Sequence, residues 1–308
     1  MRVLVLGATG FLGRHTADRL RALPGVRVLA GGRSPAGGPV DVHADLAGAD
    51  VPGLAAALRA AAPDAVVNCA GAVAGGPVEL TALNARGPAV LCEALLRAAP
   101  GARLVHLGSA AEYGPADGRR PATETGPARP LGLYGASKLA GTLAVTGSGL
   151  DAVVLRVFNP VGPGAPAASL PGRLARELRR AAPGERVRTG DLSAHRDFLD
   201  ARDLAEAVAL AVTAPGPLPP VLNAGSGTAR PVRDVAGALL RAAGRPGPTA
   251  DHIAEDGDGS PRSAAVPWQC ADVTATGRAL GWAPRRTLEE SLADLWATTA
   301  PPVTEAAP

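Results

Sequence analysis

The sequence predicts an α/β fold, in which a doubly wound parallel sheet is joined to a smaller second domain. Short β-branched or leucine-rich segments alternate with long helix-forming segments over the first hundred and sixty residues. Such alternation is typical of parallel sheets with right-handed helical crossovers. A chain of 308 residues is also long enough for a large domain and a smaller one.

The first half of the chain contains most of the regular elements. Five strands are expected, because each segment is apolar, short and followed by small residues; they cover residues 3–6, 26–30, 65–68, 104–107 and 152–157. Between them, apolar residues recur with helical spacing, which predicts helices over residues 11–23, 53–62, 88–98 and 134–145.

After Phe158 the pattern becomes less regular, and residues 159–171 are rich in Pro and Gly, which predicts a loop. Helices are then expected at 170–181, 200–212, 232–243 and 288–296, with short strands at 186–189 and 221–223. We expect one domain to comprise residues 1–158 and 196–224, the second to comprise 159–195 and 225–298, and residues 299–308 to be a disordered tail.

Composition narrows the possible partners and surroundings. The net charge is only +3 and the arginines are scattered, so no nucleic-acid-binding surface is expected. The cysteines, at positions 69, 92 and 270, have neither paired nor metal-type spacing, which predicts a cytoplasmic protein without disulfides or a metal site. The N-terminus lacks the features of a signal peptide, and no apolar run is long enough to span a membrane.

The rarest residue types indicate where the chemistry lies. Lys138 is the only lysine beside 30 arginines, and the only tyrosines are Tyr113 and Tyr134. In a chain so biased towards arginine, we expect a lysine to remain where a compact ammonium with an adjustable pKa is needed. Lys138 follows Tyr134 by four residues, so on a helix the two share a face, and the ammonium should lower the pKa of the phenol. Tyr134 is therefore a candidate acid-base group, and Ser109, at a strand end, can hydrogen-bond a substrate oxygen.

A glycine-rich turn follows the first strand directly and opens the first helix. Its glycines permit a tight turn and close approach of the backbone to a pyrophosphate, whose charge is attracted by the helix N-terminus. This position in the chain predicts a Rossmann-type dinucleotide site. The expected contacts in the turn are Gly7, Thr9, Gly10, Phe11, Leu12 and Gly13.

The end of the second strand bears on the choice of cofactor. An NAD site usually has an acidic residue there to hold the ribose hydroxyls, whereas this chain offers Arg33, which could meet a 2′-phosphate. The sequence therefore favours NADP over NAD. Asp45 and Leu46 follow a presumed third strand and are expected to border the adenine.

These motifs resemble those of the extended short-chain dehydrogenases, the nucleotide-sugar epimerase/dehydratase superfamily, nearly from end to end. The matching segments include residues 7–13, 68–71, 109–114, 130–138, 156–160, 196–198, 223–227 and 280–282. The resemblance implies catalytic roles for Ser109, Tyr134 and Lys138, a small-molecule substrate and a homodimer. It also implies cofactor contacts at Ala70, Gly71, Tyr134, Lys138 and Asn159, and substrate contacts at Ala110, Ala111, Asn159, Arg196 and Arg262.

Two departures from the family pattern refine this picture. In the 4,6-dehydratases of the family, an Asp and a Glu follow the catalytic Thr, whereas here Ala110 and Ala111 cannot do acid-base work. Glu112 is expected on a strand-like segment, pointing to the opposite face from Ala111. Residues 159–164 and 190–203 look most like the GDP-4-keto-6-deoxymannose reductases, but Ala265 stands where those enzymes typically have Asp, which leaves the nucleotide open.

The leading interpretation is an NAD(P)H-dependent ketoreductase that acts on a 4-keto-6-deoxy nucleotide sugar or on another carbonyl intermediate of a biosynthetic pathway. One alternative is a nucleotide-sugar epimerase with a retained NAD; net consumption of cofactor would distinguish the two. A second alternative is a non-catalytic dinucleotide sensor, against which the presence of both Tyr134 and Lys138 counts.

Overall fold

A computed structural model of the protein describes residues 1–33, 40–116, 118–182, 184–245, 247–256 and 265–299. Arg262 and most of the expected tail lie outside the described residues. Within these ranges, no helix combines the length and the apolar character that crossing a membrane requires.

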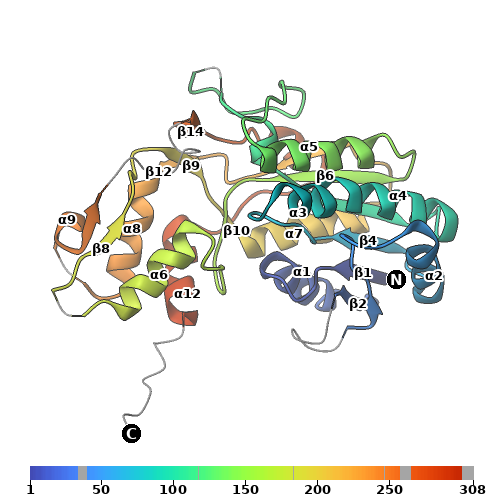
Figure 1. Cartoon of the computed structure of the whole chain (residues 1–308), viewed down its shortest axis with the longest axis horizontal. Helices are drawn as coiled ribbons and strands as arrows, with labels where there is room; N and C mark the ends of the chain where they lie inside the picture. The colour runs from blue at the N-terminus through green and yellow to red at the C-terminus, as the bar shows by residue number, and fades with distance from the viewer. Residues whose placement is uncertain (34–39, 117, 183, 246, 257–264, 300–308) are drawn as a thin grey trace, which may run out of the picture.

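A parallel sheet forms the centre of the larger part of the molecule (Figure 1). Among the described residues it has seven strands in the order β3-β2-β1-β4-β5-β6-β11. The chain thus winds outward from β1 in both directions, as predicted for a doubly wound sheet. The strands are β1 (Arg2–Leu6), β2 (Arg27–Gly32), β3 (Val42–His43), β4 (Ala65–Asn68), β5 (Arg103–Ser109), β6 (Ala152–Val157) and β11 (Val221–Ala224).

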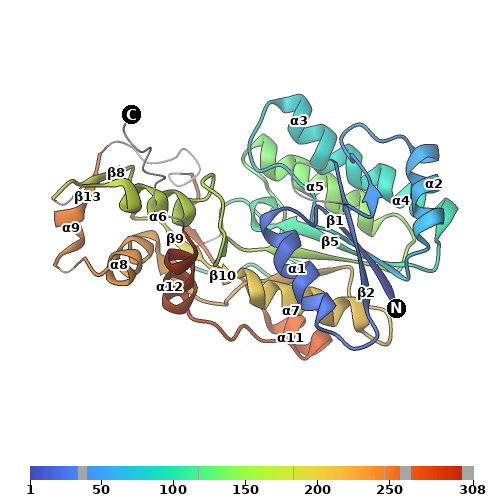
Figure 2. The same ribbon diagram turned by 90° about the horizontal axis from the view of Figure 1, so that it is seen from below.

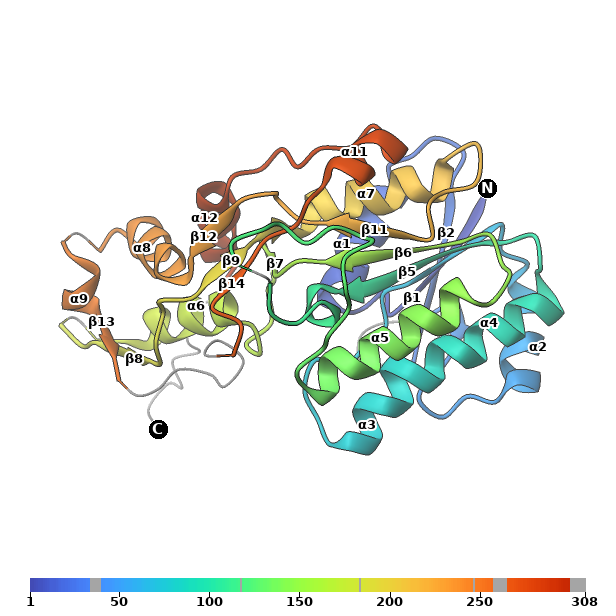
Figure 3. The ribbon, with the colours of Figure 1, turned by 90° about the horizontal axis from the view of Figure 1, so that it is seen from above.

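Helices cover both faces of this sheet (Figures 2 and 3). One face packs against α1 (Phe11–Arg21), α7 (Ala201–Thr213) and α11 (Thr274–Leu280). The other face packs against α2 (Val51–Ala61), α4 (Gly87–Ala98) and α5 (Leu133–Thr146); α4 is preceded by α3 (Pro77–Thr81) and by a π-helical turn (Ala82–Arg86).

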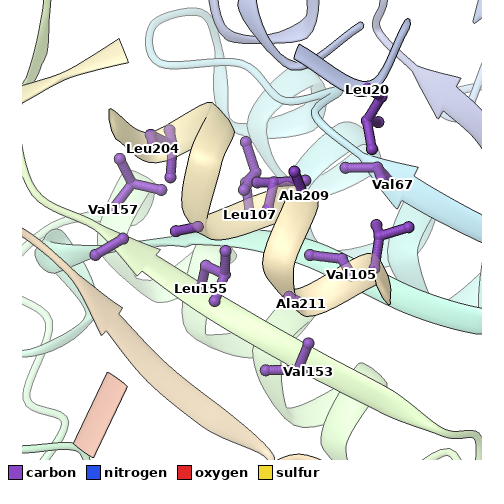
Figure 4. Close-up of a cluster of buried hydrophobic side chains, with 14 of the residues drawn as sticks. Leu20, Val67, Val105, Leu107, Val153, Leu155, Val157, Leu204, Ala209 and Ala211 are labelled. Carbon is purple, nitrogen blue, oxygen red and sulfur yellow. The ribbon is translucent and has the colours of Figure 1, made fainter. Parts of the chain in front are cut away.

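Helix α7 illustrates how the sequence pattern makes the core. Its buried apolar residues recur at the three- and four-residue spacing of a helical stripe. Figure 4 shows Leu204, Ala209 and Ala211 of this helix facing Leu107 and Leu155 of the sheet. Several of the buried α7 side chains are alanines, whose small size allows a helix to pack close to a sheet.

The smaller part surrounds a second apolar core formed mainly by α6 (Leu170–Arg180), α8 (Val232–Ala242) and α12 (Leu288–Thr298). It also contains a three-stranded sheet in the order β12-β9-β14, formed by β12 (Ala229–Pro231), β9 (His195–Asp197) and β14 (Trp268–Gln269). The remaining elements are β7 (Pro160–Val161), β8 (Val187–Thr189), β10 (Leu199–Asp200), α9 (Thr249–His252) and β13 (Ile253–Glu255).

The predicted helices and strands agree with the structure, with differences at their boundaries. Strand β7 lies inside the expected loop 159–171 and pairs with β10. Residues 196–197 belong to β9, which pairs with β12 and β14 and not with the central sheet. Conversely, α11 and Trp282 pack into the core of the larger part. The predicted division into two domains stays a prediction.

Candidate active site

The turn between β1 and α1 is packed too closely for side chains at its glycines. Gly7 has a φ of +75°, and a Cβ on it would lie 2.9 Å from the backbone nitrogen of Ala70. A Cβ on Gly13 would lie 2.0 Å from the carbonyl oxygen of Gly7. Gly10 is the N-cap of α1 and brings no side-chain acceptor to the first turn of the helix. The turn therefore offers an unobstructed helix N-terminus and fits a dinucleotide pyrophosphate.

The side chains of the other residues predicted to contact the cofactor in this turn pack in different places. Phe11 packs against the core of the smaller part, and Leu12 packs against the core of the sheet. Only their backbone N–H groups could face a pyrophosphate. Thr9 is half-buried beside them.

The predicted adenine side lies at the carboxyl ends of β2 and β3. Arg33 is exposed directly after β2, and β3 is the short third strand that the sequence analysis presumed. The Asp45 carboxylate accepts a hydrogen bond of 3.2 Å from the Ala47 N–H, whereas the Leu46 side chain is buried in the core. Asp45 and Arg33 are thus the side chains of this group that remain open to a ligand.

Ser109, Tyr134 and Lys138 are brought together where β5 ends and α5 begins. The Tyr134 hydroxyl donates a hydrogen bond of 3.3 Å to Ser109 Oγ. One helical turn later, Lys138 Nζ donates to the carbonyl oxygen of Leu107. The shared helix face predicted from the four-residue spacing is therefore present in the structure.

Lys138 lies in an environment that makes its proton easy to lose. The side chain is only 5% exposed, and burial lowers its pKa from 10.5 to about 8. The negative charge of Glu112 acts in the opposite direction and favours the ammonium. A Cβ on Gly71 would lie 3.8 Å from Nζ, so the backbone after β4 passes directly beside the ammonium. This contact brings Gly71, a predicted cofactor residue, next to α5.

Asn84 fixes the loop after β4 to α5. Its amide nitrogen donates to the Ala72 carbonyl (2.8 Å) and to Ser137 Oγ (3.2 Å). Its carbonyl oxygen accepts from the Ala72 N–H at 3.0 Å. The side chain is buried in the π-helical turn.

The expectation for Glu112 is wrong, because residues Ala110–Glu112 form a 3₁₀ turn and not a strand. Ser109 caps this turn by accepting from the Ala111 N–H, while Glu112 accepts from the Ser109 N–H, which is the reciprocal pattern of a capping box. The Glu112 side chain consequently points inward, where it forms an ion pair with Arg156. A serine followed three residues later by glutamate was the signal that could have revealed the turn.

The predicted substrate residues lie in different settings. The Ala110 side chain is fully buried in a cluster with Phe158, and the partly exposed Ala111 remains the more open of the two. Asn159 has a φ of +20° and donates to the Asp197 carbonyl at 2.8 Å, while Arg196 is mostly buried on β9.

Gln269 was missed by the sequence analysis. It is paired with Arg196 in the β14–β9 ladder and donates a hydrogen bond of 2.9 Å to the Ala110 carbonyl. This contact brings the sheet of the smaller part against the 3₁₀ turn that follows Ser109. No group of three or more His, Cys, Asp or Glu side chains that could hold a metal ion occurs in the described part of the chain.

Comparison with known proteins identifies the family. Residues 3–225 match the NAD dependent epimerase/dehydratase family. The chain belongs to this family. A family member from Kitasatospora kifunensis, dTDP-6-deoxy-L-talose 4-dehydrogenase (NAD(P)(+)), is 40% identical over 97% of this chain and 96% of its own length. The chain is therefore an oxidoreductase of the short-chain dehydrogenase type, and it depends on a nicotinamide dinucleotide.

Solved structures of the family have the same architecture. The UDP-glucose 4-epimerase of Thermus thermophilus in complex with NAD is 27% identical, with a TM-score of 0.81, over 97% of this chain and 98% of that one. MoeE5 in complex with UDP-glucuronic acid and NAD is 29% identical, with a TM-score of 0.80, over the same shares of the two chains. The resemblance to the extended short-chain dehydrogenases and the Rossmann-type fold are thus confirmed. The assignment as an enzyme also rules out the sensor alternative.

Proposed function

We propose that this enzyme transfers a hydride between NAD(P)(H) and C4 of a 6-deoxy nucleotide sugar, and that it acts mainly as the reductase of the 4-keto form. The observation that carries the proposal is the hydrogen bond between Tyr134 and Ser109 beside the buried Lys138. The name of the Kitasatospora relative supports the substrate class. Oxidation of a 4-hydroxyl and reduction of a 4-ketone are opposite directions of one reaction, so a dehydrogenase name is compatible with a ketoreductase.

Each of the three candidate catalytic residues has a separate proposed role. The bound nicotinamide supplies the hydride to the carbonyl carbon. Ser109 Oγ and the Tyr134 hydroxyl, 3.3 Å apart, can both reach one substrate oxygen, and Tyr134 gives it a proton as negative charge develops. The Lys138 ammonium stabilises the phenolate that remains and, beside Gly71, would hold the nicotinamide ribose.

Dehydration of the sugar is not part of the proposed activity. Loss of water needs one group that takes a proton from carbon and another that protonates the leaving hydroxyl. Ala110 and Ala111 stand at the positions where the dehydratases carry carboxyls, and the Glu112 carboxylate is buried against Arg156. The burial of Glu112, and not an opposite strand face, is the observation that supports excluding it from acid-base work.

Two further features of the proposal concern the cofactor and the assembly. The exposed Arg33 at the end of β2 supports a preference for NADPH, because a guanidinium there can pair with a 2′-phosphate. We also propose a homodimer. Leu96 on α4 and Leu143 on α5 are exposed large apolar side chains on neighbouring helices and are candidates for its interface (Figure 3).

The test supplies the purified enzyme with a dTDP-4-keto-6-deoxyhexose and NADPH. We expect one NADPH to be oxidised for each 4-hydroxy product formed, and no conversion of dTDP-glucose to the 4-keto-6-deoxy sugar. The second candidate is an epimerase, which the likeness to the Thermus UDP-glucose 4-epimerase favours. Interconversion of two 4-epimers by protein that purifies with NAD, without added cofactor, would reject the reductase and establish the epimerase.

A further inference from the structure

Behind the candidate catalytic residues, one buried carboxylate contacts three separate elements. Glu112 accepts hydrogen bonds from the Ser109 N–H at 2.7 Å, from the Thr142 hydroxyl at 2.9 Å and from Arg156 Nε at 2.8 Å. Ser109 ends β5, Thr142 lies on α5, and Arg156 lies on β6. Thr142 follows Lys138 by one helical turn, so the carboxylate contacts the same face of α5 that carries the catalytic lysine.

We propose that Glu112 is a positioning residue, which ties the end of β5 to α5 and thereby holds Ser109 in place against Tyr134 and Lys138. This inference rests on the proposed catalytic roles of those three residues. Glu112 itself is completely buried, so its effect on the reaction must pass through its neighbours.

Two glycines leave the space that this arrangement needs. A Cβ on Gly108 would lie 2.7 Å from Glu112 Oε1, so a side chain there would displace the carboxylate. A Cβ on Gly135, the residue after Tyr134, would lie 2.4 Å from the carbonyl oxygen of Ala111. The 3₁₀ turn therefore packs directly against the first turn of α5. A shift of Glu112 would move the turn against the helix that carries Tyr134.

Arg156 on β6 donates to the same carboxylate oxygen of Glu112 that the Thr142 hydroxyl contacts. Its guanidinium stacks over the Tyr113 ring, 4.5 Å from the centroid, and the Tyr113 hydroxyl donates to Asn223 at 2.7 Å. The side chains of the Glu112–Arg156 pair are 0% and 6% exposed. A pair so fully removed from water has a large desolvation penalty and is a weak source of net stability. A role in fixing geometry accounts for its presence better than stability does.

The charge of Glu112 gives the proposal a signature in the pH dependence. Lys138 is surrounded by Glu112 of the 3₁₀ turn, Cys69 after β4, His106 of β5 and Tyr134 of its own helix. Burial lowers the pKa of Lys138, and the negative charge of Glu112 raises it. Without that charge the pKa of Lys138 would fall further, so the ammonium would lose its proton at a lower pH.

The experiment compares the Glu112→Gln variant with the wild type in the full chain, measuring kcat, KM, cofactor Kd and the pH profile of kcat. We expect kcat to fall about 10- to 100-fold, since small misplacements of reacting groups have effects of this order. Cofactor Kd should stay within about threefold. The alkaline decline of kcat should move to lower pH by roughly one unit, in keeping with a single neighbouring charge.

Two further variants separate positioning from stability. Thr142→Val removes the contact with α5 but keeps the carboxylate charge, so kcat should fall about 3- to 10-fold without a shift of the alkaline limb. It also tests the proposal if Glu112→Gln does not fold. Asp200→Asn is the matched control, because Asp200 is likewise buried and accepts from a backbone N–H, a hydroxyl and a guanidinium. The Asp200→Asn variant should have a lower free energy of unfolding and an unchanged pH profile of kcat.

The outcomes distinguish this inference from the function on which it rests. Wild-type kcat and pH profile in Glu112→Gln, wild-type kcat in Thr142→Val, or an equal shift of the alkaline limb in Asp200→Asn would each overturn the positioning role alone. A Tyr134→Phe variant with normal turnover would overturn the proposed catalytic residues, and the positioning role with them.

Discussion

Replacing Lys138 with methionine should abolish turnover and, at neutral pH, raise the free energy of unfolding. Methionine is close to lysine in length but carries no charge. The variant therefore removes the ammonium that assists Tyr134 and also removes the cost of burying that ammonium. A catalytic group that is costly to the fold is expected to show both effects together.

The expected increase in the free energy of unfolding follows from the lowered pKa of Lys138. A fall from 10.5 to about 8 corresponds to about 3 kcal/mol of unfavourable interaction at pH 7, at 1.36 kcal/mol per pKa unit. Methionine also leaves the Leu107 carbonyl without the Nζ donor, which costs about 1–2 kcal/mol. The net gain should therefore be about 1–2 kcal/mol at pH 7.

The increase in the free energy of unfolding of the variant should become smaller as the pH rises. Between about pH 8 and 10.5 the unfolded wild type binds more protons at Lys138 than the folded wild type does. The free energy of unfolding of the wild type therefore rises with pH across this window, and the methionine variant lacks that rise. We expect the advantage of the variant to shrink by about 2 kcal/mol between pH 7 and pH 10. No other lysine can contribute, because Lys138 is the only one.

Equilibrium urea unfolding at pH 7 and pH 10, with NADPH oxidation measured in parallel, checks this prediction. Arg97→Met, at an exposed position of α4, is the control and should change stability by less than about 0.5 kcal/mol at either pH. A Lys138→Met variant less stable than the wild type at pH 7, or a stability difference that does not change with pH, would refute the reasoning.

Three further predictions concern activity. Tyr134→Phe should bind cofactor normally but lose about 10²- to 10⁴-fold in kcat, as measured by NADPH oxidation, because the phenol is the proposed proton donor; near-normal turnover would reject that assignment. Lys138→Arg should also be inactive although it keeps the charge, since a planar guanidinium does not fit the buried site beside Leu107 and Gly71; full activity would mean that the single lysine has no special role. Arg33→Ala should narrow the ratio of NADH to NADPH dissociation constants, and a wild type that prefers NADH would contradict the role of Arg33.

Much of the site could be read from the sequence because its signals are local. Gly7, Gly10 and Gly13 lie within one turn and one helix start, and Tyr134 and Lys138 lie one helical turn apart. Their relative positions follow from standard helix geometry once the element type is known. The order of apolar strands and amphipathic helices predicted the doubly wound sheet for the same reason.

The surroundings of the catalytic residues were decided by contacts between distant segments. Glu112 was expected on a strand-like segment, yet the capping box with Ser109 and the pairing with Arg156, 44 residues away, turn it inward. Gln269 reaches the Ala110 carbonyl across 159 residues of sequence. The sequence around each of these residues carries no signal for such contacts, because burial and charge pairing between distant segments depend on which elements pack together. The sequence by itself thus determined the fold class and the three candidate catalytic residues, whereas the lowered pKa of Lys138 and the carboxylate behind Ser109 exist only once β5, β6 and α5 enclose them.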